Sequence, residues 1–533
     1  MRGKRLLKLS RASAVAAALL SATGPVGMAQ SVEATPRLRA LDFSPFEDAM
    51  ATFPAEIYAA LDQVLPSSSV MDVQEALEAG DINSEMLVTY FLHRISVYDD
   101  RLRTYIELNP EALEDAREAD RLRSDGTILG SLHGIPVSLK DNIETAGPMH
   151  TTAGAEVLFD NVASDDAELV TQLREAGAII LGKANLSEFA GSIAIGPMLG
   201  GTTAVAGQGM NPYGSYPTGG SSSGSAGGVA SMLAMVSVGS ETSGSLITPA
   251  AWNSVVGMKP SKGVVSGDGV IPLLTNNDSA GPIARSVTDA AVLLSVIDTA
   301  EHDYTADLAV NALDRVAVGV LASDLAVEDG NAELLQRIAS ILVLTGAEVK
   351  PAQMEGSDVA MADFSKFLAG GVRYDMLPYV AAVNPDVVSP QDLRDYNAAD
   401  ATRRIPFGQD ILDIQAQVAE SVTVDEFEAL AVSLTATAKN LLDTAFEQSD
   451  AEVLVSIDNS HSMIYATAGY PAITLPLGAR LRGGFAAQIG LDAEGMPVGV
   501  TLIGKQGEDG KLLAYAYAFE QVSHLRLQPM LDD

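Results

Sequence analysis

The sequence predicts a layered α/β fold, in which helices cover a parallel or mixed β-sheet. Short apolar runs bounded by turn residues, which are typical of buried strands, alternate along the chain with amphipathic helical segments. The segment DDAELVTQLREAGAIILGKANL shows this alternation in one stretch: a helix, a break at Gly177 and a buried strand over 178–181. Strands that alternate with helices favour an α/β sheet over an all-helical or all-β fold.

The helical part of this pattern begins near Met71. In INSEMLVTYFLHRISVYDDRL, residues 82–102, apolar side chains recur at helical spacing, and Asn83 or Ser84 stands at the N-cap position. A second, more polar helix is expected in NPEALEDAREADRLRSDG and should end near Gly126. No internal repeat is present.

The strand part begins with GIPVSLKDNI, a short apolar run that ends in charged residues. Further strands are expected over 317–321, 452–456, 472–476 and 497–503. Residues 350–430 are expected to be helical and irregular. Their aromatic side chains should belong to the core, with a pocket lining as the weaker alternative: Phe364, Phe367, Tyr374, Tyr379 and Phe407.

The first 30 residues, MRGKRLLKLSRASAVAAALLSATGPVGMAQ, have the order of a secretory signal peptide. A basic lead precedes a short apolar run, and small residues follow at a cleavage site near Ala29. We therefore expect a Sec-type signal peptide over 1–29, an N-terminal segment over 30–70 and one folded domain over 71–533, located in the periplasm or the medium. No later stretch is long enough to predict a membrane span.

Composition excludes several classes of function. The formal net charge is −36, which makes nucleic acid a poor partner and predicts a solvated acidic surface. The chain has no cysteine, so thiol nucleophiles, thiolate zinc sites and iron–sulfur clusters are excluded. The six histidines are scattered without metal-binding spacing, and His93 is expected to be structural. We expect no metal and no cofactor.

Two short patterns suggest other chemistry but lack the required context. GAIILGK, residues 177–183, resembles a phosphate loop, yet Ala184 follows it and its centre is a buried strand. GSSSG, residues 220–224, fits a serine nucleophile elbow, but turn residues rather than a strand precede it. A triad built on this elbow would need His461, and it is the weaker hydrolase hypothesis.

Serine and lysine are the remaining catalytic candidates. A serine hydroxyl needs a base, and a buried lysine can serve when burial lowers its pKa. Lys140 stands at the end of the apolar strand IPVSLK, Ser221 follows a Gly-Gly pair, and Ser245 lies in the Ser/Gly turn ETSGSLITP. Successive N–H groups of such a turn could bind an oxyanion. Composition alone leaves both serines as ordinary turn formers.

At these residues the sequence resembles the amidase signature family. Ser221 and Ser245 have the family's spacing of 24 positions, and GIPVSLKDNI is similar to the strand of its catalytic lysine. The similarity covers roughly residues 71–525 in the family's order, with these further segments: LREAGAIILGKANLSEFA, VVGMKPSKGVVS, DSAGPIARSVTDAA and AGYPAITLPLG.

The resemblance implies a single α/β/α domain with a large mixed sheet surrounded by helices. It also implies that Ser245 is the nucleophile, that Ser221 follows a cis peptide bond and bridges to the base, and that Lys140 is the base. The oxyanion hole would consist of the backbone N–H groups of Thr242, Ser243, Gly244 and Ser245.

The chain departs from the family where the turn often reads D-T-G-G-S-I-R. Here Glu241 replaces the aspartate, and Ile247 replaces an arginine that would pair with the acidic residue. This variant is most similar to the bacterial peptide-amidase branch, which implies C-terminal peptide amides as substrates. An acylase or esterase for bulky aryl amides, a tRNA-dependent amidotransferase subunit and a non-catalytic periplasmic binding protein are the alternatives. The oligomeric state is not predicted.

Overall fold

The computed structural model describes residues 37–321, 331–480 and 495–531, so the expected signal peptide over 1–29 lies outside the described residues. A mixed sheet of 11 strands runs through the molecule in the order β1-β3-β2-β6-β8-β7-β12-β13-β11-β9-β10. The strands are β1 (Tyr105–Leu108), β2 (Pro136–Lys140), β3 (Ile179–Ala184), β6 (Val236–Glu241), β7 (Val256–Lys259), β8 (Ser279–Ala284), β9 (Ala317–Leu321), β10 (Glu348–Ala352), β11 (Val453–Ile457), β12 (Ala472–Ala479) and β13 (Pro497–Ile503).

Parallel pairs occur at two places in this sheet and antiparallel pairs join them. Strands β3, β2 and β6 are parallel neighbours, as are β11, β9 and β10. Between β6 and β11, each of the neighbouring pairs is antiparallel. The prediction of an α/β fold with one large mixed sheet and surrounding helices is thereby confirmed.

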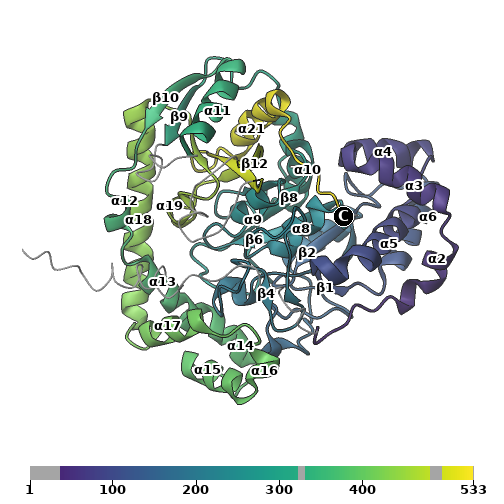
Figure 1. The fold of residues 1–533 in the computed structure, drawn as a ribbon, viewed down its shortest axis with the longest axis horizontal. Coiled ribbons are helices and arrows are strands. Elements are labelled where there is room, and N and C mark those ends of the chain that lie inside the picture. The colour runs from purple at the N-terminus through teal and green to yellow at the C-terminus, as the bar shows by residue number, and fades with distance from the viewer. Residues whose placement is uncertain (1–36, 322–330, 481–494, 532–533) are drawn as a thin grey trace, which may run out of the picture.

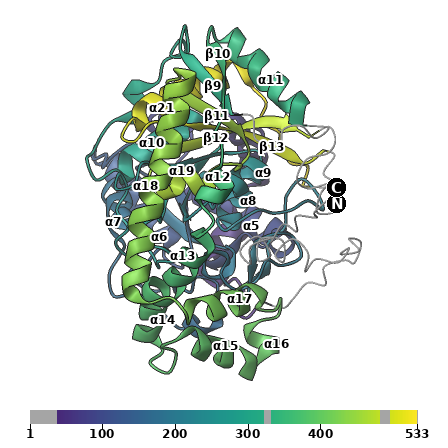
Figure 2. The same ribbon diagram turned by 90° about the vertical axis from the view of Figure 1, so that its left-hand side faces the viewer.

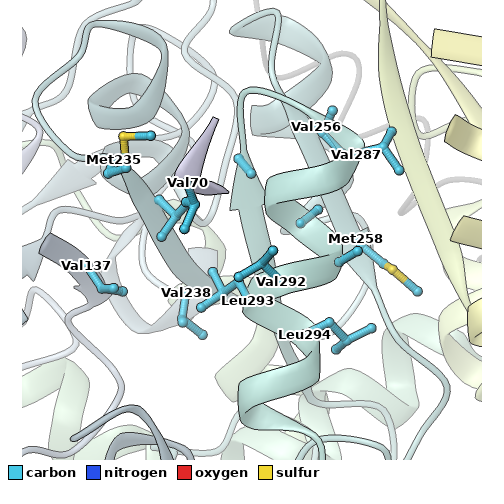
Figure 3. Close-up of a cluster of buried hydrophobic side chains, with 14 of the residues drawn as sticks. Val70, Val137, Met235, Val238, Val256, Met258, Val287, Val292, Leu293 and Leu294 are labelled. Carbon is cyan, nitrogen blue, oxygen red and sulfur yellow. The ribbon is translucent and has the colours of Figure 1, made fainter. Parts of the chain in front are cut away.

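One face of the sheet carries the largest apolar core. Alternate residues of β2 and β6, such as Val137 and Val238, pack there against α10 (Val287–Ile297). Figure 3 shows Val292 and Leu293 of α10 beside these strand residues. Helix α21 (Asp509–Ser523) extends the same core along β12 and β13. Hydrophobic contacts with these helices therefore bury this face of the sheet.

The opposite face is covered by short helices with small residues. Helices α8 (Ser223–Ala230) and α9 (Ile247–Trp252) form a second apolar cluster with Ile283 of β8. Beyond them, α19 (Ser462–Ala468) packs against the 26-residue α18 (Val424–Ser449). Because Ser138 and Lys140 alternate with Val137 and Leu139, their side chains point to the face of α8 and α9.

The N-terminal helices form a separate layer, in purple at the right of Figure 1. They are α2 (Glu47–Thr52), α3 (Ala55–Val64), α4 (Val70–Ala79), α5 (Ser84–Leu102) and α6 (Ala112–Ser124). Helix α5 starts where predicted: the Asn83 side chain accepts a hydrogen bond from the N–H of Met86 at 2.8 Å. His93 is structural, because its Nε2 lies 2.8 Å from the carbonyl oxygen of Met50.

Residues 350–430 are largely helical, as predicted. Most of their helices lie toward the bottom of Figures 1 and 2, whereas α12 (Ser357–Ala360) lies higher, beside α18. The region also includes α13 (Phe364–Gly371), a π-helical turn (Val372–Met376), α14 (Leu377–Val383), α15 (Pro390–Ala399), α16 (Ala401–Arg404) and α17 (Asp410–Ala419). Phe364 and Phe367 belong to the core. Tyr374, Tyr379 and Phe407 are half-buried. The core interpretation therefore holds for two of the five aromatic residues.

In the 11-stranded sheet, four strands were not predicted from the sequence: β1, β7, β8 and β10. The other expected strands are present, and those at 317–321 and 497–503 have the predicted bounds. Further along the chain, α11 (Asn331–Leu344) precedes β10, and α7 (Glu168–Glu175) precedes β3. Within the described ranges, no helix combines the length and the apolar composition that crossing a bilayer requires.

Two glycines of α8 give a direct test of how closely this helix packs. A Cβ atom at Gly224 would lie 2.3 Å from the carbonyl oxygen of Thr104 and 2.5 Å from the backbone of Asn185, whereas one at Gly227 would be 3.4 Å from a methyl group of Thr104. We expect Gly224→Ala to lower the free energy of unfolding by about 1–3 kcal/mol. Gly227→Ala should change it by less than about 1 kcal/mol, because helix propensity favours alanine. Urea unfolding of both variants measures the difference, and equal effects would contradict the close approach.

Candidate active site

Lys140 lies at the carboxyl end of β2 and is fully buried. Its Nζ donates to the Ser221 hydroxyl at 2.7 Å, and lies 3.0 Å from the carbonyl oxygen and 2.9 Å from the hydroxyl oxygen of Ser240. Burial lowers the pKa of Lys140 to about 7, against the opposing effect of the Asp278 and Glu241 carboxylates. The lysine is therefore held among neutral partners, where its amine can lose a proton near neutral pH.

Ser221 is fixed by the chain that precedes α8. The Gly220–Ser221 peptide bond is cis, as the family resemblance implied. The carbonyl oxygen of Ser221 accepts the N–H of Ser187 at 2.9 Å. The N–H of Ser222 in turn donates to the carbonyl oxygen of Ser245 at 3.1 Å, which holds the two serine segments together. The structure thus brings Lys140, Ser221 and Ser245 to one place.

The residues after β6 form a tight turn that presents Ser245. Gly244 has φ +81°, a conformation that favours glycine, and both Ser221 and Ser245 are less than one-tenth exposed. In the described part of the chain, the backbone N–H groups of Ser243, Gly244 and Ser245 have no backbone hydrogen-bond partner. Buried N–H groups without a partner can bind a negatively charged oxygen.

Two carboxylates hold this turn from either side. Glu241 Oε2 accepts the N–H groups of Leu246 and Ile247 at 2.7 and 3.1 Å. Asp278 accepts the Thr242 hydroxyl at 2.5 Å. Ile247 is fully buried in an apolar cluster, so at this position the chain has a hydrophobic contact where the family often has an arginine. Glu241 therefore binds backbone N–H groups instead of a guanidinium.

Three residues that contact the site were not predicted from the sequence: Ser240, Asn142 and Ser187. Asn142 follows Lys140 by two positions and donates to the Ser240 hydroxyl at 3.0 Å. For Asn142, the only indication in the sequence is that a polar residue stands two positions after a lysine that is expected to be buried. Nothing in the sequence distinguishes Ser187 from other loop serines.

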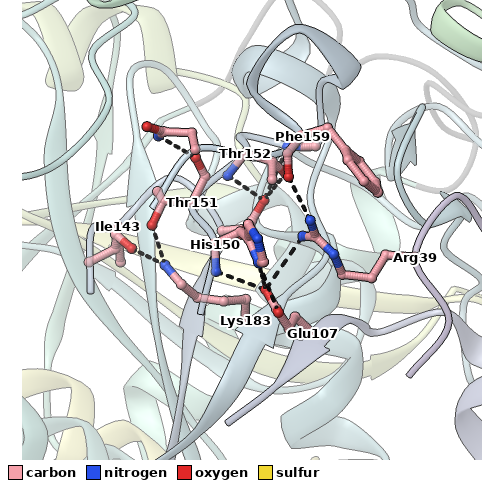
Figure 4. A network of polar contacts seen from close by, with 11 residues as sticks. Arg39, Glu107, Ile143, His150, Thr151, Thr152, Phe159 and Lys183 are labelled. Carbon is pink, nitrogen blue, oxygen red and sulfur yellow. Dashed lines mark hydrogen bonds and ion pairs between the residues drawn. The ribbon is translucent and has the colours of Figure 1, made fainter. Parts of the chain in front are cut away.

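A buried network fixes the end of β2 on the side away from Ser221. Thr152 and Gly154 donate to the Asp141 carboxylate, while Lys183 donates to the carbonyl oxygen of Ile143 and to the Thr151 hydroxyl. Burial raises the pKa of Asp141 to about 6 and lowers that of Lys183 to about 8. Figure 4 shows how the polar contacts continue toward the surface through Arg39, Glu107 and His150.

The alternative serine elbow is not formed. No strand leads into residues 217–222, and the Ser222 hydroxyl donates to the Ser240 carbonyl at 3.0 Å. No hydrogen bond joins Ser222 to His461 within the described ranges, where His461 Nδ1 is buried and unpaired. Burial lowers the pKa of His461 to about 4. The described residues also contain no group of three or more His, Asp or Glu side chains that could hold a metal ion.

Comparison with known proteins agrees with this arrangement. A family model described as Amidase matches residues 86–513. A Bacillus anthracis amidase family protein superposes with a TM-score of 0.82 at 34% identity, covering 91% of this chain and 97% of that chain. The peptide amidase of Stenotrophomonas maltophilia gives a TM-score of 0.78 at 35% identity, covering 88% and 99%. A probable amidase of Arabidopsis thaliana is 33% identical over 492 residues, which are 87% of this chain and 92% of that protein. The chain therefore belongs to the amidase signature family and is an amide hydrolase.

Proposed function

We propose that the protein hydrolyses amides through an acyl-enzyme, with Ser245 as nucleophile, Ser221 as bridging acid and base, and Lys140 as the final proton acceptor. The observation that carries this proposal is the 2.7 Å hydrogen bond between Lys140 Nζ and Ser221 Oγ in a fully buried site. A neutral amine is a base strong enough to take a serine proton, and burial supplies the neutral form.

In the first half-reaction, Lys140 takes the proton of Ser221 while Ser221 takes the proton of Ser245. Ser245 Oγ bonds to the amide carbon, and the carbonyl oxygen becomes negatively charged. Ser221 then gives a proton to the leaving nitrogen as the C–N bond breaks. In the second half-reaction, water loses its proton through the same relay, attacks the ester and releases the acid.

The backbone N–H groups of Thr242, Ser243, Gly244 and Ser245 form the oxyanion hole in this proposal. Three of them have no backbone partner in the described chain, and the turn is held by Glu241 and Asp278 from either side. Donors that are already in place stabilise the oxyanion without reorganisation, an effect worth about 3–4 kcal/mol per donor in the transition state.

We further propose that C-terminal peptide amides are substrates and that the protein is exported to the periplasm or medium. The similarity to a peptide amidase supports the substrate, and the basic and apolar leader supports export. An amidotransferase subunit is the weaker alternative, because a formal charge of −36 repels tRNA. A binding protein would leave the buried lysine–serine contact without a role.

Product analysis of the purified protein tests both the reaction and the substrate. The panel contains C-terminal peptide amides, simple primary amides, anilides and esters, with the Ser245→Ala variant alongside. We expect ammonia from the peptide amides, and a loss of at least about 10³-fold in the variant because no other hydroxyl forms the acyl-enzyme. Cleavage of anilides with primary amides untouched would instead indicate an acylase. Unchanged activity of Ser245→Ala would contradict the proposed nucleophile.

The pH dependence tests the role of Lys140. Its pKa is lowered to about 7, and only the neutral amine accepts a proton, so kcat/KM should rise with pH up to about 7 and then level off. Below that pH it should fall about tenfold per unit. Lys140→Arg keeps the positive charge but cannot deprotonate, so its activity should be lost across the range. A flat profile between about pH 5 and 8, or an active Lys140→Arg variant, would exclude lysine as the base.

A further inference from the structure

Helix α19 contacts the nucleophile turn at its two ends. At its start, Ser462 Oγ lies 3.5 Å from Ser243 Oγ. Near its end, Thr467 Oγ1 accepts the side-chain amide of Asn277 at 3.0 Å, and the same amide lies 3.4 Å from the carbonyl oxygen of Thr242. The start of the helix therefore contacts the turn directly, and its end is linked to the turn through Asn277. Tyr465 lies between these two contacts.

Tyr465 and Glu241 each present a buried oxygen toward this interface. Tyr465 is fully buried, and Glu241 is 1% exposed. Among the described residues, neither the Tyr465 hydroxyl nor Glu241 Oε1 has a hydrogen-bond partner. Tyr465 packs in the same apolar cluster as Ile247, whose N–H group the Glu241 carboxylate accepts. Burial and the Glu241 carboxylate raise the pKa of Tyr465 well above its ordinary value, which agrees with this placement. An unpaired buried phenol and an unpaired buried carboxylate oxygen each carry a free-energy cost, which a hydrogen bond between the two would remove.

The second oxygen of Glu241 extends this pairing to the nucleophile. Oε2 accepts the N–H groups of Leu246 and Ile247, the two residues that follow Ser245. One carboxylate thus joins α19 to the backbone that carries Ser245. Ile247 and Tyr465 also belong to the same apolar cluster, so the side chain of Ile247 cannot supply a polar partner for Glu241.

We propose that Tyr465 is a positioning residue for the reaction: its hydroxyl donates to Glu241 Oε1 and, through Glu241, holds the turn that presents Ser245 and the oxyanion N–H groups. This inference rests on the proposed function of Ser245. Tyr465 touches neither substrate nor the reacting atoms. The neutral phenol takes the place of the arginine that the family often has at position 247.

The experiment compares Tyr465→Phe with Tyr105→Phe. Tyr105 is an equally buried tyrosine on β1, whose hydroxyl donates to the carbonyl oxygen of Leu233 at 2.9 Å, in a part of the core away from the turn. Both variants lose one buried hydrogen bond and should lose similar thermal stability. Because only Tyr465 acts on the turn that presents Ser245, Tyr465→Phe should also lower kcat by about 10- to 100-fold. KM should stay within about threefold, and Tyr105→Phe should keep native kcat.

A double-mutant cycle with Glu241→Gln separates positioning from a general loss of packing. If Tyr465 acts through Glu241, the double variant should lose no more activity than the worse single variant. Independent losses that multiply, or a Tyr465→Phe kcat within twofold of native, would overturn the inference. If Tyr465→Phe does not fold, the kcat of Glu241→Gln is measured instead. A native kcat in that variant would also overturn the inference. An active Ser245→Ala variant would instead refute the proposed function, so the two failures are distinguishable.

Discussion

The burial of Lys140 among neutral partners is the constraint on which the site depends. Its amine contacts hydroxyl and carbonyl oxygens of Ser221 and Ser240, and no carboxylate touches it in the described structure. An adjacent carboxylate would keep the amine protonated. The two acidic residues in its vicinity, Glu241 and Asp278, are instead occupied by backbone N–H groups and by the Thr242 hydroxyl. The contacts that keep these two carboxylates away from Lys140 therefore also hold the nucleophile turn.

The serine- and glycine-rich composition of the central segment follows from how closely its layers approach. A Cβ at Gly239 of β6 would lie 2.8 Å from the Ser222 hydroxyl oxygen, and one at Gly257 of β7 would lie 2.5 Å from Ala250 of α9. Side chains larger than hydrogen would push α8 and α9 away from the sheet. Ser221 and Ser245 would then move away from Lys140. Small residues that resemble a flexible linker in the sequence thus make a rigid, close-packed layer.

Much of the fold could be predicted from the sequence, because buried parallel strands and amphipathic helices have distinct periods. The strand around Lys140 and helix α5 are examples. β8 was missed because SAGPIA contains a glycine and a proline, and β10 because its residues Glu348–Lys350 are largely exposed at the sheet edge. At the site, local motifs pointed to Lys140, Ser221 and Ser245. Tyr465 lies 220 positions after Ser245 and carries no motif, so only its three-dimensional contacts identify it.

The replacement of an arginine by Ile247 also bears on the base. A guanidinium beside the turn would add a positive charge close to Lys140 and lower its pKa further. With isoleucine there, that positive charge is absent, and the Glu241 carboxylate raises the pKa of Lys140. Burial then lowers the pKa of Lys140 to about 7, while Asp278 and Glu241 oppose a larger decrease. Glu241 therefore acts on both halves of the site: it binds the backbone of the nucleophile turn, and its charge opposes the effect of burial on the pKa of Lys140.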